Sequence, residues 1–296
     1  MKARRASRTA ELMALFRALE SGRPPKIRLF HDPYAIRFLG ASLRTLVWLS
    51  YVPLVGRLVP WLVDLRAPGA RSSGVARTRL IDDLVTQALR DGIDQVVILG
   101  AGFDCRALRL PGLENARVFE LDHPNTLAVK RERVRGILGS LPVHVQFIEV
   151  DFNRQRLNDV LDASRLDQAR PIIVIWEGVT NYLTDGAVDA TLTVVGTMAP
   201  GSRVIFTYVH RDALDESGDF YGINRLTRDL RRLGEPWTFG LYPEQLPDYL
   251  TARGLRLMED LGSTEYRKRY MAPRPAIVRG YEFYRVAVAR VVPKVS

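Results

Sequence analysis

The stretch QVVILGAGFD, residues 95–104, decides the fold class, because a short apolar run ends directly in a glycine turn. The run Gln95–Leu99 is typical of a buried strand, and the glycines after it let the backbone turn tightly. Stretches of helical length separate further apolar runs, which cover residues 118–121, 143–150, 172–176 and 204–208. Continuous apolar strands that alternate with helices predict a parallel sheet covered on both faces.

The sequence of the C-terminal part of the chain predicts that one edge of this sheet is antiparallel. Strands are expected over 256–261 and 279–289, and these two are expected to form an antiparallel pair at one edge. Helices are expected over residues 124–139, 154–164, 186–198 and 244–253. We therefore predict a doubly wound, Rossmann-like α/β fold of seven mostly parallel strands with an antiparallel C-terminal edge.

The N-terminal part of the chain is basic, partly apolar and mostly helical in pattern. The sequence APGARSSG at 67–74 is the nearest feature to a joint, and an amphipathic helix with an apolar stripe between 80 and 88 follows it. We expect residues 1–74 to form a helical lid and residues 75–296 to form the ligand-binding domain.

Composition excludes several classes of protein. Of the 296 residues, 47% are apolar and 26% charged, which is ordinary for a globular protein and argues against disorder. Cys105 is the one cysteine, so an intrachain disulfide and a thiolate zinc site are excluded, and a reducing, cytoplasmic location is expected. The four histidines are scattered along the sequence, and no metal site is expected.

The net charge of +10 is concentrated near the N-terminus, where residues 1–80 contain 15 Lys and Arg against 4 Asp and Glu. An acidic small-molecule substrate is therefore the expected partner, whereas contact with an anionic membrane surface is an alternative that is not favoured, and solubility alone would also explain the charge. Nucleic acid is not expected, because no helix-turn-helix, RNP or zinc-finger pattern accompanies the basic residues.

The segment LRTLVWLSYVPLVGRLVPWLV, residues 43–63, approaches the length of a membrane span, but two arginines and two prolines interrupt it. We predict two short apolar helices that cover a pocket, with Trp48, Tyr51 and Trp61 among its lining residues. The alternative is a hairpin in a membrane interface, where basic flanks and these aromatic side chains suit the headgroup region.

Ligands of such sheets bind beyond the carboxyl ends of the strands, so the residues that follow each strand are the candidate site. After the first strand, Gly100 and Gly102 permit close backbone approach, but the dinucleotide fingerprint requires a third glycine where Cys105 stands. Asp104 suits an ammonium group better than a pyrophosphate. The turn therefore favours a ligand with a cationic head over NAD.

Three further strand ends each present a carboxylate. Asp122, or Glu120 on the same face, stands about 20 residues after the glycine turn, where an acid accepts hydrogen bonds from ribose hydroxyls. Asp151 and the backbone of Phe152 suit the amino group and a ring nitrogen of adenine. Glu177 follows an apolar strand, and a charge there is better explained by a ligand than by the core.

Several motifs, in the same order, resemble the leucine carboxyl methyltransferase family of S-adenosylmethionine-dependent methyltransferases. They are HDPYA at 31–35, ARTRLIDD at 76–83, QVVILGAGFDCRALRL at 95–110, VFELDHPNTLAVK at 118–130, VDFN at 150–153, WEGVTNYL at 176–183 and GSRVIFTY at 201–208. The resemblance implies S-adenosyl-L-methionine as cofactor. It implies that Asp122 binds the ribose of this cofactor and that Asp151 and Phe152 bind its adenine. It also implies that Arg77 pairs with the cofactor's carboxylate, that Glu177 lies near its ammonium and that Tyr182 lines the reacting end.

The chemistry follows from this cofactor, because a methyl group on a sulfonium is already electrophilic and the protein mainly has to align donor and acceptor. A carboxylate acceptor needs no base, whereas a hydroxyl must lose a proton, and His210 after the fifth strand is the candidate base. The arginine-rich N-terminus favours an acidic acceptor. Tyr182, Tyr221 and Trp237 are expected to add to an aromatic pocket.

Three functions remain open. The first is an O-methyltransferase that acts on a carboxylate or acidic hydroxyl of a partly apolar small molecule in secondary metabolism. The second is a protein carboxyl methyltransferase that acts on a chain terminus. The third is a cofactor-binding module without turnover that contacts a membrane interface through residues 43–63.

Overall fold

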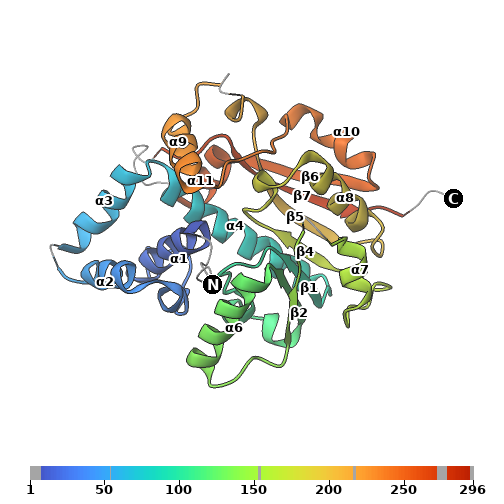
Figure 1. Ribbon diagram of the computed structural model, residues 1–296, viewed down its shortest axis with the longest axis horizontal. Coiled ribbons are helices and arrows are strands. Elements are labelled where there is room, and N and C mark those ends of the chain that lie inside the picture. The colour runs from blue at the N-terminus through green and yellow to red at the C-terminus, as the bar shows by residue number, and fades with distance from the viewer. Residues whose placement is uncertain (1–7, 54, 153–154, 216–217, 272–278, 294–296) are drawn as a thin grey trace.

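A seven-stranded sheet forms the centre of the protein in a computed structural model that describes residues 8–53, 55–152, 155–215, 218–271 and 279–293 (Figure 1). The strands are β1 (Gln95–Leu99), β2 (Arg117–Asp122), β3 (Val145–Glu149), β4 (Ile173–Trp176), β5 (Arg203–Val209), β6 (Leu255–Gly262) and β7 (Tyr284–Val291). Their order is β3-β2-β1-β4-β5-β7-β6. β1 to β5 are parallel, whereas β7 is antiparallel to both β5 and β6. The predicted fold class is confirmed, antiparallel edge included.

The final strand, β7, begins later than its apolar pattern predicts, at Tyr284 rather than at residue 279. The residues before it are held away from the sheet by hydrogen bonds. The backbone N–H of Tyr281 donates to Oγ of Ser73 at 2.7 Å, and that of Tyr284 donates to the carbonyl of Tyr281 at 2.9 Å. This segment therefore closes over the N-terminal half of the chain instead of lengthening the strand.

Helices cover both faces of the sheet, as the alternating pattern predicts. They are α1 (Arg8–Ser21), α2 (Ala41–Leu49), α3 (Leu58–Arg66), α4 (Ala70–Arg90), α5 (Arg106–Arg109), α6 (Pro124–Leu138), α7 (Leu157–Asp162), α8 (Asp185–Gly196), α9 (Ile223–Leu233), α10 (Leu246–Thr251) and α11 (Ser263–Met271). Apolar residues of α7, α8 and α10 join one core cluster, and those of α4 and α11 join the other. Arg154, in the helix predicted over 154–164, lies outside the described residues, and the observed helix starts at Leu157.

The long helix α4 confirms the predicted amphipathic stripe, because Leu80, Ile81, Val85 and Ala88 are all buried against the sheet. It begins at Ala70, earlier than expected, so it runs through the segment 67–74 that the sequence suggested as a joint. The division of the chain at residue 74 into lid and domain stays a prediction.

The N-terminal segment packs onto the glycine turn rather than forming a separate body. Ala14, Leu15 and Phe16 of α1 share a core cluster with Phe103, and the rings of Phe38 and Phe103 lie 5.1 Å apart. This contact sets α1 across the carboxyl ends of the strands. The pair α2 and α3 extends outward from the same region (Figure 1). Across the described ranges, no helix combines the length and apolar character needed to cross a membrane.

Candidate functional site

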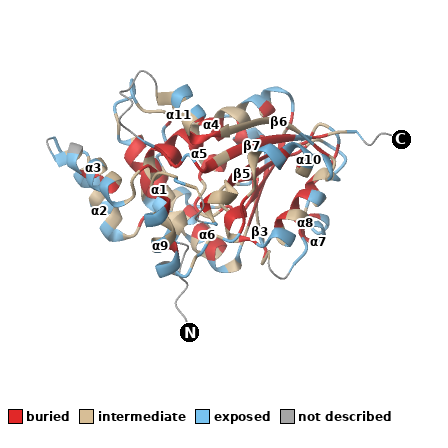
Figure 2. Cartoon of the chain, turned by 90° about the horizontal axis from the view of Figure 1, so that it is seen from above, coloured by how far each residue is buried: buried red, intermediate tan, exposed pale blue. Residues whose placement is uncertain are grey.

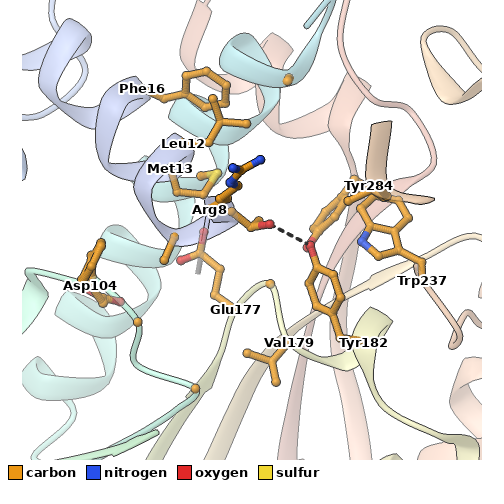
Figure 3. A pocket seen from close by; sticks show the side chains of 18 of the residues that line it. Arg8, Leu12, Met13, Phe16, Asp104, Glu177, Val179, Tyr182, Trp237 and Tyr284 are labelled. Carbon is orange, nitrogen blue, oxygen red and sulfur yellow. Dashed lines mark hydrogen bonds between the residues drawn. The ribbon is translucent and has the colours of Figure 1, made fainter. Parts of the chain in front are cut away.

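A cavity of about 710 Å³ lies where β1, β2, β3 and β4 end, and α1 and α9 close it from the other side. This volume is in the range of roughly 300–1,000 Å³ that is typical of small-molecule sites. The predicted site residues that line it are Arg77, Gly100, Gly102, Asp104, Asp122, Asp151, Phe152, Glu177 and Tyr182. Figure 3 shows Asp104 and Glu177 on one side of the cavity and Tyr182 and Trp237 on the other. The structure therefore brings together side chains from all four strand ends.

The glycine turn after β1 needs glycine for two physical reasons. Gly100 has a φ of 66°, which side chains disfavour, and a Cβ on it would lie 2.3 Å from Cγ2 of Val179. The backbone N–H of Gly102 donates to Oδ2 of Asp122 at 2.5 Å, while Oδ1 of Asp122 accepts from the N–H of His123 at 2.6 Å. The turn is thus tied directly to the end of β2.

Two acids on β2 were candidates for a ribose contact, and the structure separates them. Glu120 is 1% exposed and its Oε2 lies 2.6 Å from Nζ of Lys130. Burial raises the pKa of Glu120 to about 7, although Lys130 opposes this. Asp122 lines the cavity instead, and burial raises its pKa as well. The pair Glu120–Lys130 supports the strand from within, and Asp122 faces the ligand space.

The end of β3 presents Asp151 and Phe152 to the cavity. The backbone N–H of Asp151 donates to Oε1 of Gln155 at 2.9 Å, which closes a local turn after the strand. Asn153, the last residue of the VDFN motif, lies outside the described residues. This end of the cavity therefore offers an aromatic face next to a carboxylate.

Arg77 and Glu177 form the floor of the cavity as a buried ion pair. Nε of Arg77 lies 2.8 Å from Oε1 of Glu177, and the guanidinium also covers the ring of Tyr284 at 4.5 Å. Oε2 of Glu177 accepts from Nη1 of Arg106 at 2.8 Å, and the same Nη1 contacts Oδ2 of Asp104 at 2.5 Å. Arg106 is thus the shared partner of both predicted carboxylates, and sequence reasoning did not single it out.

The ion pairs continue as a chain into the N-terminal segment. Arg106 and Arg109 both pair with Asp82, at 2.8 and 2.7 Å, and Asp32 lies 3.5 Å from Nε of Arg109 and 2.9 Å from Nε of Arg17. We call these eight residues the ion-pair chain: Arg17, Asp32, Arg77, Asp82, Asp104, Arg106, Arg109 and Glu177. Four positive and four negative charges balance within it.

The electrostatics of this chain hold its two cavity-facing acids in the ionised state. Burial alone would favour their neutral forms, but Arg106, Lys130 and Arg17 together outweigh it at Asp104, and Arg106 together with Arg77 outweighs it at Glu177. The pKa of each carboxyl is therefore lowered. Ionised carboxylates in a buried, charge-balanced setting suit a zwitterionic ligand, since its ammonium and carboxylate find complementary partners without adding net charge.

The other end of the cavity is aromatic. The hydroxyl of Tyr182 donates to Oγ1 of Thr9 on α1 at 3.4 Å, and its ring meets that of Trp237 edge to face at 6.4 Å (Figure 3). Tyr281 and Tyr284 also line this end, and the sequence analysis missed both because they lie within the strand predicted over 279–289 rather than after the end of a strand. Their one sequence signal is the aromatic cluster YEFY at 281–284.

Several aromatic residues expected in the pocket lie elsewhere. Trp48, Tyr51 and Trp61 are 59%, 43% and 58% exposed, and no described residue between 43 and 63 lines the cavity. The prediction that these two helices cover the pocket is therefore wrong, because α2 packs against α1 and α3 packs against α4, while their large aromatic side chains are exposed outside the cavity. Tyr221 is also absent from the lining, and its ring lies under the guanidinium of Arg279 at 4.1 Å.

His210 does not line the cavity either. Its Nδ1 accepts from the backbone N–H of Asp212 at 3.3 Å, and its ring packs against those of Phe220 and Tyr242. It caps the short helix η5 (Arg211–Ala213) that follows β5. The structure thus gives His210 a local structural contact in place of the reacting-end position that the sequence suggested.

The comparisons with known proteins agree with this geometry. The family model described as leucine carboxyl methyltransferase matches residues 10–196. The chain belongs to the leucine carboxyl methyltransferase family. A relative from Streptomyces coelicolor, provisionally named an S-adenosyl-L-methionine-dependent methyltransferase, is 35% identical over 70% of this chain and 70% of its own. A Parafrankia relative with the same provisional description is 31% identical over 93% of this chain and 84% of its own.

Two further comparisons bear on length and fold. A relative from Mycolicibacterium gilvum is 35% identical over 68% of this chain, and the matched part spans 65% of that relative's length. A crystal structure from Thermobifida fusca, described provisionally as a methyltransferase, aligns with a TM-score of 0.61 and 17% identity over 99% of this chain and 97% of its own. The shared fold and family identify the chain as an S-adenosylmethionine-dependent methyltransferase.

The donor chemistry of the cavity fits this cofactor. Each oxygen of Asp122 accepts one backbone hydrogen bond, which leaves it able to accept further bonds from hydroxyls of a ribose. The backbone of Gly100 and Gly102 lines the cavity without side chains, beside the charge-balanced end formed by Arg77, Glu177 and Asp104. Within the described ranges, no group of three or more His, Cys, Asp and Glu side chains is arranged to hold a metal ion.

Proposed function

We propose that this methyltransferase transfers a methyl group to an oxygen of a carboxylate, or of an acidic hydroxyl, on a partly apolar small molecule of secondary metabolism. The observation that carries the proposal is the contrast between the two ends of one cavity. The strand ends present ionised carboxylates, whereas the end under α1 and α9 is aromatic and carries arginines. Apart from the ion-pair chain, four arginines in the described part of the protein line the cavity from outside the sheet, namely Arg8 of α1, Arg66 at the end of α3, and Arg225 and Arg232 of α9, together with one acid of α9, Asp229.

The cofactor would be held by the residues at the strand ends. We assign its ribose to Asp122, its adenine to Asp151 and Phe152, and its amino-acid part to Arg77 and Glu177. When bound, S-adenosylmethionine supplies an activated methyl group, so the protein need not generate a strong electrophile. Gly100 and Gly102 let the backbone come close to the amino-acid part.

The acceptor end favours a group that is already ionised. Burial raises the pKa of Tyr182 and Tyr284, so both hydroxyls stay protonated at neutral pH and donate hydrogen bonds rather than remove protons. Arg225 and Arg232 on α9 would orient a carboxylate, since a guanidinium offers a planar pair of donors. A carboxylate attacks without a base, which agrees with the position of His210 away from the cavity.

The helix α1 would exclude water from the transfer. Leu12, Met13 and Phe16 line the cavity from this helix, and Thr9 holds the hydroxyl of Tyr182 (Figure 3). An apolar cover strengthens electrostatic contacts inside a site and prevents loss of the methyl group to water. These contacts support α1 as the part of the predicted N-terminal lid that covers the site.

The experiment that tests the proposal is a turnover assay with methyl-labelled S-adenosylmethionine and three acceptor panels: aryl and alkyl carboxylic acids, phenols, and peptides with a free C-terminal carboxylate. We expect transfer to carboxylic acids with a partly apolar body, and a product that mild base cleaves, because methyl esters hydrolyse and methyl ethers do not. Transfer to peptides alone would replace the proposal with a protein carboxyl methyltransferase. Binding of S-adenosylhomocysteine without any turnover would indicate a cofactor-binding module.

Two matched substitutions on α9 make the assay specific. Arg232→Gln removes a charge that lines the cavity, and we expect kcat/KM for anionic acceptors to fall about tenfold, as for one charged hydrogen bond. Arg228→Gln changes an exposed arginine of the same helix that is not in the lining, and it should leave kcat/KM unchanged. Equal effects of both substitutions would argue against an acceptor contact on α9.

A further inference from the structure

The two helices α2 and α3 and the turn between them, residues 41–53 and 55–66, carry an unusual amount of exposed apolar surface. We call this unit the apolar hairpin. Fourteen large apolar side chains are exposed in the described part of the chain, and nine of them belong to the hairpin. These nine are Trp48, Leu49, Tyr51, Val52, Val55, Leu58, Trp61, Leu62 and Leu65. Figure 2 shows the hairpin at the edge of the molecule with mostly exposed residues.

The hairpin is apolar on both of its faces. Val47, Val59 and Val63 are buried on the inner side and belong to the core cluster of the N-terminal segment. A surface helix of a globular protein normally has a polar outer face, and large exposed apolar patches mark contact surfaces. Since the inner face of the hairpin packs into the core of the protein, the outer face is the one available to a partner.

Basic residues surround this apolar surface. Gly22 approaches the ring of Tyr51 so closely that a Cβ on it would lie 2.1 Å from Cε1, so the loop that contains Arg23, Lys26 and Arg28 adjoins the turn of the hairpin. On the other side, Nη1 of Arg225 donates to the carbonyl of Leu65 at 2.9 Å, which fixes the basic helix α9 beside α3.

The local charge is one-sided. Residues 22–66 contain seven Lys and Arg against two acids, Asp32 and Asp64. Both acids pair with arginines outside this stretch: Asp32 lies 2.9 Å from Arg17 and Asp64 lies 2.5 Å from Arg71. Of the seven basic residues, Arg23 pairs with Glu20 outside the stretch at 3.1 Å. The surroundings of the apolar surface are therefore cationic, and an anionic partner complements them.

We propose that the apolar hairpin inserts its outer face into the interface of a lipid bilayer that contains anionic lipids. Tryptophan and tyrosine side chains favour the headgroup boundary, and neighbouring Lys and Arg residues attract anionic headgroups. α2 and α3 each have nine residues, which is about 14 Å of helix and too short to cross the hydrocarbon core. The contact is thus peripheral, with both helices lying in the interface rather than spanning the bilayer.

Co-sedimentation with vesicles tests the proposal on the full chain. We expect the protein to sediment with vesicles of phosphatidylcholine and phosphatidylglycerol in equal parts, to bind pure phosphatidylcholine more weakly, and to lose binding as salt is raised. The double variant Trp48→Ser/Trp61→Ser should lower the partition coefficient at least about 30-fold, because two large apolar side chains no longer leave water. It should also lose the blue shift of tryptophan emission on vesicle addition.

A control variant separates this surface from general surface hydrophobicity. Val143 and Met258 are exposed apolar residues on other parts of the molecule, so Val143→Ser/Met258→Ser should leave vesicle binding unchanged. Retained binding of S-adenosylhomocysteine by both variants confirms that they are folded. A protein that stays in the supernatant with both vesicle types overturns the proposal. A concentration-dependent dimer that Trp48→Ser/Trp61→Ser dissociates, without vesicle binding, also overturns it and assigns the surface to a second copy of the chain.

Discussion

Replacing Gly100 by alanine tests whether the glycine turn is built for close approach. The φ of 66° places this residue in the left-handed region, where an alanine costs roughly 1–2 kcal/mol. The new Cβ would also lie 2.3 Å from Cγ2 of Val179, and overpacking of this kind costs about 1–3 kcal/mol. We therefore expect Gly100→Ala to lower the free energy of unfolding by about 2–5 kcal/mol.

Thermal unfolding measures this loss, and a second glycine divides it into its two parts. Gly92 has a φ of 89° and no atom within 4 Å of the position of a Cβ, so Gly92→Ala reports the backbone cost alone. Since 1 kcal/mol corresponds to about 2 °C in a chain of this size, Gly100→Ala should lower Tm by roughly 4–10 °C and Gly92→Ala by roughly 2–4 °C.

The double variant Gly100→Ala/Val179→Ala removes the steric part of the cost and keeps the backbone part. Its destabilisation should therefore be smaller than the sum of the two single substitutions by about 1–3 kcal/mol. A Gly100→Ala protein that is no less stable than Gly92→Ala would refute the close contact between the two loops. Titration with S-adenosylhomocysteine should show weakened binding in Gly100→Ala and unchanged binding in Gly92→Ala.

Three further outcomes follow from the site. Asp122→Ala should weaken the binding of S-adenosylhomocysteine in isothermal titration by about 1–3 kcal/mol. The control Asp159→Ala, on α7 and outside the cavity, should leave this affinity unchanged. Equal affinities of the two variants would exclude Asp122 as the ribose contact. The folded-state pKa values of Asp104 and Glu177 lie below the ordinary values of 3.8 and 4.5, so their contribution to stability is complete at neutral pH and is lost as pH falls below about 4. Glu177→Gln should accordingly lower Tm at pH 7 and flatten its decline in acid, and an unchanged acid slope would contradict the buried pairing. His210→Ala should leave kcat for a carboxylate acceptor within a factor of about two, because His210 contacts a helix cap rather than the cavity, and a large loss would restore it as a base.

The sheet could be predicted from sequence because its strands are buried on both faces. Five apolar runs between helices leave few alternatives, and the residues directly after them must meet at one edge. Gly100, Asp122, Asp151 and Glu177 were therefore placed in one site from order alone, and they line one cavity in the structure. Position relative to a strand end is a strong signal because it follows from topology.

The partners of the charged residues could not be predicted in the same way. Arg106 pairs with Asp82 and with Glu177, which are 24 and 71 positions away in the sequence, and no periodicity links such residues. A usable signal was the charge of Arg77 and Asp82 within the otherwise buried stretch of α4. Buried charges require partners, so these two residues could have indicated an ion-pair network, which the sequence analysis did not predict.

The prediction that α2 and α3 face the pocket was wrong for a different reason. A helix that is apolar all round has no polar face, so its sequence does not say which side meets the protein. The pattern over residues 43–63 gave two helices correctly, with Leu54 outside the described residues. It could not show that Trp48 and Trp61 point away from the cavity.

The ion-pair chain has a consequence for how the empty enzyme meets its cofactor. Its eight side chains are withdrawn from water when the chain folds, so the cost of dehydrating them falls on folding rather than on ligand entry. The amino-acid part of a ligand then meets charges that are already fixed in direction and poorly hydrated. The reversal of any one charge between Arg17 and Glu177 would leave a neighbouring residue of the chain beside a like charge, away from water. Changes along this line of residues are therefore expected to succeed only as compensating pairs.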